Sequence, residues 1–130
     1  LPIRTDIDAE NNLSVTRFTG VVTEAEFREY AARLRRGFDR TRNAIADLRS
    51  SDLKLATAAV RAIAEAMRPT SAGGDHRRVA IVVAGDTSYG LGRMFQSIQA
   101  DAANVYVFRE YDEAFRWVTG TTSPGDDDLR

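Results

Sequence analysis

One polar segment, Gly85–Arg93, follows an apolar run at a point where a buried strand should give way to a helix. Backbone N–H groups at a helix start, with an arginine one turn further on, suit a small anion or a lipid head group. A P-loop would have lysine at Leu91, and a dinucleotide-binding loop would have its last glycine at Phe95. Neither motif is therefore present. The plain alternative is a turn with glycines for tight packing. The residues of this candidate ligand site are Ser88, Tyr89, Gly90 and Arg93.

A second polar segment brings a carboxylate and two hydroxyls together after the apolar run Asn43–Leu48. From Leu55 to Met67 apolar residues recur at helical spacing, with cap candidates just before them. We therefore expect this segment to form a corner where a strand ends and a second helix begins. The residues of interest there are Asp47, Ser50 and Ser51.

Composition excludes several kinds of catalytic site. The 130 residues are 43% hydrophobic and 28% charged, which is typical of one soluble globular domain. The absence of cysteine excludes disulfides and cysteine nucleophiles, and the single histidine, His76, excludes a histidine-rich metal centre. Ser51–Lys54 matches S-x-x-K without its companion motifs, and no G-x-S-x-G elbow is present. We expect no enzymatic activity, no cofactor and no metal.

Charge and hydropathy narrow the choice of partner. The formal net charge of -1 and the sequence pI of about 5.9 argue against nucleic-acid binding. The arginines between Arg28 and Arg42 alternate with acidic residues, as on a solvated helix face. No run approaches the roughly 18 apolar residues of a membrane span, and no signal peptide is visible. We expect a cytoplasmic protein.

Local patterns at the start of the chain predict a hairpin and a helix. Alternating apolar and polar residues predict strands at Ile3–Ile7 and Leu13–Thr19, and Phe18 breaks the alternation, which indicates a bulge. Thr23 and Glu26 have the spacing of a capping box, which marks the beginning of the first helix.

The rest of the chain alternates between strand and helix patterns. Further strands are expected at 43–48, 79–84 and 105–108, and further helices at 55–67, 91–98 and 114–118. This order predicts one α/β domain over residues 1–120, followed by a flexible acidic tail at 121–130. Its single, mostly parallel sheet would have about five strands, an N-terminal antiparallel hairpin and about four helices.

Five segments also carry the pattern of a known family: 20–23, 46–48, 78–83, 88–93 and 107–117. They resemble the SpoIIAA-like family of small bacterial proteins, which is related in fold to STAS and CRAL-TRIO domains. The resemblance covers about residues 3–119 and implies a sheet of about five strands with helices packed against it. It implies little about activity, because most of the family has no assigned function.

The resemblance also implies a regulatory site. STAS switch proteins act through a serine at the start of the second helix, and Asp47 with Ser50 and Ser51 partly matches their motif. Asp52 replaces a glycine of that motif, and the loop is several residues shorter. A phosphate at such a corner would meet free backbone N–H groups and the positive end of the helix dipole. In the plain alternative, Ser51 or Asp52 only caps the helix.

Together these observations predict a non-enzymatic, STAS-like regulatory module that binds a protein partner through Asp47, Ser50 and Ser51. The alternative is a protein that binds a small molecule, an anion or a lipid head group at the segment containing Arg93. Aromatic residues could then wall an apolar pocket. A homodimer formed through the outer faces of the helices is a further expectation. The aromatic residues concerned are Tyr89, Tyr106, Tyr111, Phe115 and Trp117.

Overall fold

Five strands form one sheet in the computed structural model, which describes residues 3–35, 42–54, 56–66, 78–99 and 104–120. The strands are β1 (Ile3–Asp8), β2 (Leu13–Thr23), β3 (Asn43–Lys54), β4 (Arg78–Val82) and β5 (Asn104–Phe108). The helices are α1 (Glu24–Arg35), α2 (Thr57–Ala66), α3 (Asp86–Gln99) and α4 (Tyr111–Thr119). The expected α/β architecture is confirmed.

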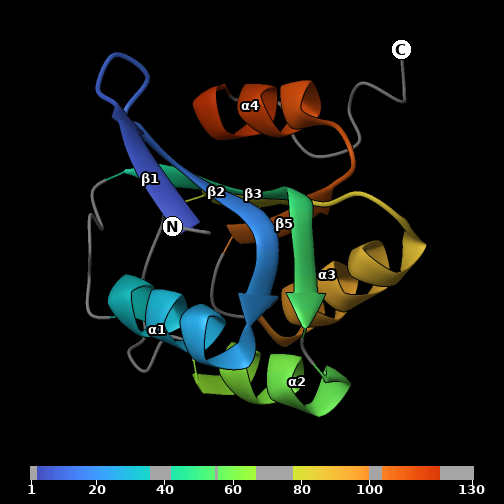
Figure 1. The fold of residues 1–130 in the computed structure, drawn as a ribbon. Helices are drawn as coiled ribbons and strands as arrows, with labels where there is room; N and C mark the ends of the chain where they lie inside the picture. The colour runs from blue at the N-terminus through green and yellow to red at the C-terminus, as the bar shows by residue number, and fades with distance from the viewer. Residues whose placement is uncertain (1–2, 36–41, 55, 67–77, 100–103, 121–130) are drawn as a thin grey trace.

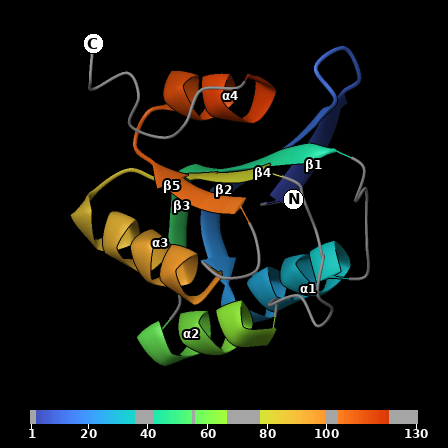
Figure 2. The ribbon, with the colours of Figure 1, turned by 180° about the vertical axis from the view of Figure 1, so that it is seen from behind.

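The strands lie side by side in chain order, from β1 at one edge to β5 at the other. Only β1 and β2 are antiparallel, and each later strand is parallel to its predecessor. Because all three parallel connections advance in the same direction, right-handed crossovers place α1, α2 and α3 on one face of the sheet. The last helix, α4, covers the other face (Figures 1 and 2).

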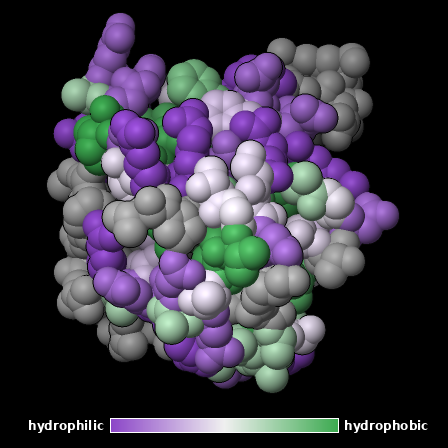
Figure 3. All heavy atoms as spheres, viewed as in Figure 1, coloured by the Kyte–Doolittle hydropathy of each residue, from purple (hydrophilic) through white to green (hydrophobic). Residues whose placement is uncertain are grey.

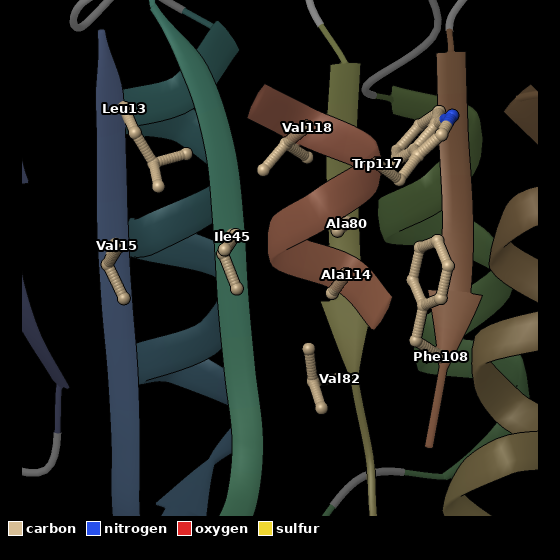
Figure 4. Packing of buried hydrophobic residues seen from close by; sticks show 9 residues of the cluster. All are labelled: Leu13, Val15, Ile45, Ala80, Val82, Phe108, Ala114, Trp117 and Val118. Atoms are coloured by element: carbon tan, nitrogen blue, oxygen red, sulfur yellow. The ribbon is translucent and has the colours of Figure 1, made fainter. Parts of the chain in front are cut away.

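Apolar side chains fill both faces of the sheet, which explains why β4 shows no alternation in its sequence. On the face of α1–α3, one cluster gathers around Ile81, Val83 and Val107, and a second around Phe18 and Val22. Figure 4 shows the α4 side, where side chains from four strands meet the helix. This cluster comprises Leu13, Val15, Ile45, Ala80, Val82, Phe108, Ala114, Trp117 and Val118.

The first helix begins as its sequence predicts. The backbone N–H of Glu26 donates to Thr23 Oγ1 at 3.2 Å, and the backbone N–H of Thr23 donates to Glu26 Oε1 at 3.0 Å. The Thr23 hydroxyl also donates to Glu26 Oε1, at 2.9 Å. The hydrogen bonds that Glu26 accepts from the Thr23 backbone and hydroxyl hold its pKa below the usual value. Phe27 packs against the cluster that contains the fully buried Val22, so the capping box and its hydrophobic staple are both present.

Two expected helix starts are wrong. Strand β3 continues to Lys54 because its last residues pair with the end of β2, and α2 begins only at Thr57. Helix α3 begins at Asp86 rather than after Gly90. Gly85 alone turns the chain there, with a φ of +84°, and the backbone N–H of Tyr89 donates to its carbonyl at 3.1 Å.

Polar groups at the starts of β3 and β4 anchor the last helix. Arg78 Nη1 donates to the carbonyls of Trp117 and Gly120, each at 2.7 Å, and Asn43 Nδ2 donates to the carbonyl of Val118 at 2.6 Å. These donors satisfy carbonyls that the end of a helix leaves without partners. The anchor therefore fixes α4 against the sheet by one end.

Within the described ranges, no helix is long and apolar enough to cross a membrane. His76 and the expected acidic tail lie outside the described residues.

Candidate functional site

A bulge between β2 and β3 shapes the candidate site. Arg17 of β2 pairs with Asp47 of β3, but two residues further along β2, Thr19 pairs with Ser50. Strand β3 therefore has one extra residue opposite Phe18. The irregularity predicted at Phe18 is confirmed, although the extra residue belongs to the partner strand. A bulge re-aims neighbouring side chains, and here it turns Arg49 back toward Asp47.

Asp47 is the buried centre of this charged site, with an exposed fraction of 6%. Arg49 donates from Nε to Oδ1 and from Nη2 to Oδ2, both at 2.9 Å, and its backbone N–H donates to Oδ1 at 3.1 Å. Arg17 Nε lies 4.0 Å from Oδ2. Burial by itself raises the pKa of Asp47, but the hydrogen bonds from Arg49 and the two positive charges outweigh it and lower the pKa. Asp47 is thus ionised and paired.

An aromatic ring holds the same arginine from another direction. The Arg49 guanidinium lies 5.1 Å from the centroid of the Tyr111 ring, which stacks on Phe115 at 6.5 Å. Burial raises the pKa of the Tyr111 hydroxyl, so this side chain is neutral at ordinary pH. With a carboxylate and a ring both fixing it, Arg49 presents its exposed part, 43% of the side chain, in a defined position.

Beside this charged site, β2 and β3 extend past the rest of the sheet. Strand β4 pairs with β3 only as far as Asp47, whereas β2 and β3 continue together to Thr23 and Lys54 (Figure 1). Phe18 and Val22 point toward α1, so the alternate residues face the other way. We call these alternate residues, all of them exposed, the ribbon face: Thr19, Val21, Ser50 and Asp52.

The structure turns Ser51 away from the other two residues of the expected switch. Asp47 is buried in its ion pair, and Ser50 is exposed on the ribbon face. Ser51 pairs with Gly20, so it points to the opposite side, and its hydroxyl donates to the carbonyl of Leu48 at 2.8 Å. Neither serine lies at a helix start. The expected strand-to-helix corner is therefore wrong, because strand pairing keeps this segment extended.

The second candidate segment lies inside α3 rather than in a turn. Asp86 already places a carboxylate in the first turn of the helix, where Arg109 pairs with it at 3.0 Å. The Arg109 guanidinium also lies 4.3 Å from the centroid of the Tyr89 ring. A carboxylate at this position opposes a second anion. Three of the residues, Ser88, Tyr89 and Gly90, belong to the first turns of α3, and Arg93 is exposed further along it.

The five aromatic residues do not all lie on one face of the sheet. Tyr89 packs with the cluster of α2 and α3, whereas Tyr111 and Phe115 pack on the α4 side of the sheet. Tyr106 meets Trp117 edge-on, at 5.3 Å between ring centroids. The sheet separates Tyr89 from the other four rings, so the five do not form one wall, and a pocket among the four on the α4 side stays a prediction. Nor do the described residues contain a group of three or more metal-ligating side chains.

Sequence reasoning found Asp47 and Ser50 but missed Arg17, Arg49 and Val21. Arg17 and Arg49 lie 32 positions apart in the chain and meet only through strand pairing. The one local signal was the break at Phe18, which marked the bulge without showing which side chain it would turn.

Fold and site together define an α/β domain with one sheet, a helix-covered core and an open ribbon. The chain belongs to the SpoIIAA-like family, whose model matches residues 13–119. A similar solved structure is that of an uncharacterized protein of the DUF3478 family with a SpoIIAA-like fold from Shewanella loihica PV-4. The two chains are 16% identical with a TM-score of 0.56, and the match covers 89% of this chain and 91% of the other. No curated protein matches the sequence.

Proposed function

We propose that this protein is a non-enzymatic binding module that docks a protein partner on its ribbon face. One face of a parallel strand pair carries this proposal, because within the described part of the chain it is exposed. Parallel sheets are ordinarily covered on both faces, because their side chains are apolar on both. Here one face of the β2–β3 ribbon is open, and Val21 is 54% exposed.

The surface around the ribbon supports this proposal. In Figure 3, residues of intermediate and high hydropathy gather over the ends of β2 and β3, and hydrophilic residues border them. Val21 is the one apolar residue of the ribbon face, and an apolar centre within a polar rim is the usual anatomy of a protein interface. Arg17 and Arg49 lie on the same side of the sheet as Val21, so the partner should offer an apolar group and a carboxylate to them.

The charged site adds a preformed anchor. Arginine is enriched among the residues that dominate binding energies, particularly where it is fixed before the partner arrives. Asp47 and Tyr111 hold Arg49 in the free protein, so docking would cost little side-chain entropy there. Ser50 adjoins this arginine, and a phosphate on it would change the charge of the docking surface.

Photo-cross-linking in the native host tests the proposal. A photoreactive residue replaces Val21 in one variant and Ser50 in another, and matched controls carry it at the exposed Arg61 or Glu65 of α2. We expect the same discrete protein adduct from both ribbon positions and its absence from both α2 positions. Adducts are identified by mass spectrometry after denaturing purification.

The binding energetics are then measured with the purified partner. Arg49→Ala should weaken binding about tenfold or more in calorimetry, whereas Arg61→Ala should leave it unchanged. Adducts that are the same from the ribbon and from α2, or none from the ribbon, would show that the ribbon face docks no partner.

A further inference from the structure

The two edges of the sheet differ in what their outer strands expose. At the β5 edge, Gln96 Oε1 accepts the backbone N–H of Val107 at 3.0 Å, so a side chain of α3 occupies a group that could pair with another strand. At the other edge lies β1, where Ile7 is 48% exposed. Edge strands are templates for pairing with another chain unless they are guarded. Strand β1 is therefore the edge that presents an exposed apolar side chain to another strand.

Five residues of β1, Ile3–Ile7, form a sequence that is complementary to itself when it is reversed. From Ile3 to Ile7 the strand reads apolar, basic, threonine, acidic, apolar. Within this segment, the charged residues Arg4 and Asp6 share one face of the sheet with Arg17, and the other three residues share the opposite face. In an antiparallel pairing of two such strands, each base therefore meets an acid and each isoleucine meets an isoleucine.

We infer that a second copy of this chain pairs its β1 with this one, antiparallel about a two-fold axis at Thr5. Ile3 then lies opposite the partner's Ile7, and Arg4 lies opposite the partner's Asp6. The two sheets become one continuous sheet of ten strands, five from each copy. Such an isologous contact uses one patch twice and closes on itself.

The pairing adds ion pairs on one face of the two strands and apolar contacts on the other. Arg4 Nε already lies 3.4 Å from Asp6 Oδ1 in its own strand, and the partner adds a second pair, so that four charges alternate in sign. On the other face, Ile3 packs against the cluster under α1, and the partner's Ile7 extends that apolar row. The exposed part of Ile7 is covered in the same way.

Other registers are disfavoured by the same residues. A shift of the axis to Arg4 sets two arginines opposite each other, and a shift to Asp6 sets two aspartates opposite each other. A shift by one residue puts the apolar face of one strand beside the charged face of the other. The axis at Thr5 is therefore selected by charge and by polarity together.

Charge exchange tests this interface with the full chain. Sedimentation or light scattering should give a concentration-dependent rise from 14.4 kDa toward twice that mass. Arg4→Asp alone and Asp6→Arg alone should each raise the dimer dissociation constant about tenfold or more, since each sets like charges opposite each other. The double exchange should restore the dimer, and so should an equimolar mixture of the two single variants.

Cross-linking through the axis gives an independent readout. The chain has no cysteine, so Thr5→Cys introduces one thiol, which should oxidise rapidly to a disulfide-linked dimer. Directly opposed strand residues have Cα atoms about 4.5–5.5 Å apart, within the range that a disulfide spans. Ser97→Cys, at an exposed position of α3, is the control and should cross-link slowly.

Two results would overturn the proposed β1 pairing, and one would support it. A monomer at the highest soluble concentration would overturn the inference. A dimer that both single charge variants leave intact would place the contact elsewhere and overturn it as well. Mutual rescue of the two single variants, with cross-linking specific to Thr5→Cys, supports the pairing. This result is independent of the proposed partner on the ribbon face.

Discussion

Replacing Arg49 by alanine should destabilise the fold through the carboxylate that the change leaves behind. Asp47 is 6% exposed, and its close hydrogen bonds from a side chain come from Arg49, whereas Arg17 lies 4.0 Å away. Breaking a buried ion pair costs about 3–5 kcal/mol. Because the Arg49 side chain is 43% exposed, water can replace part of its contribution, and we expect a loss of about 2 kcal/mol at pH 7.

The loss of stability caused by Arg49→Ala should depend on pH, because it depends on the charge of Asp47. In the native protein the pKa of Asp47 is lowered, so the ion pair contributes stability above the unfolded pKa, which is about 3.9. That contribution is lost as the pH falls through the lower folded pKa. In Arg49→Ala, burial is opposed only by the backbone N–H at position 49 and by the distant Arg17, so the pKa of Asp47 should rise from its value in the native protein. Protonation should then relieve the variant, and the difference in stability should shrink from pH 7 to pH 3.

Urea denaturation of four proteins measures this effect: wild type, Arg49→Ala, Asp47→Asn and the double variant. We expect Arg49→Ala to cost much less when Asp47 is already an asparagine, with a coupling energy of about 1–2 kcal/mol. A cost that is the same at pH 3 and pH 7, together with zero coupling, would refute the reasoning. Such a result would assign the loss to the contact of Arg49 with Tyr111.

Three further predictions concern the scaffold, and thermal or urea unfolding measures each. Gly92→Ala should cost about 1–3 kcal/mol, because an added Cβ would lie 2.6 Å from Val107 Cγ2; a neutral result would mean that α3 shifts freely. Thr23→Ala should cost about 1 kcal/mol by removing the cap, and its effect should fall at acid pH, where Glu26 is protonated in both proteins. Arg78→Ala should cost about 2 kcal/mol and loosen α4 first, seen as faster hydrogen exchange in that helix; unchanged exchange would contradict the anchoring role.

Much of the fold could be predicted because its signals are local. The capping box at Thr23, the irregularity at Phe18 and the apolar run of β4 each depend on residues within a few positions of one another. Strand and helix patterns in alternation then restrict the topology to a mostly parallel sheet. The same local signals failed at Ser50 and Gly90, where a cap or a turn was the better local interpretation.

The candidate site depended on contacts that no local pattern contains. Strand β3 stays extended through Ser50 because β2 pairs with it, and the bulge brings Arg49 and Arg17 to one carboxylate. Whether the ribbon face is open depends on the position of α4 on the sheet. That position is set by the packing of the whole apolar cluster between α4 and the sheet.

The sequence by itself determined the order and type of the elements, the cap of α1 and the self-complementary order of residues in β1. Only the tertiary structure decided that β1 is an edge, that one face of the ribbon is uncovered and that Asp47 is buried with Arg49. The physical reason is that a local pattern arises from the chain's own geometry. Strand register and coverage arise instead from packing between residues that are far apart in sequence.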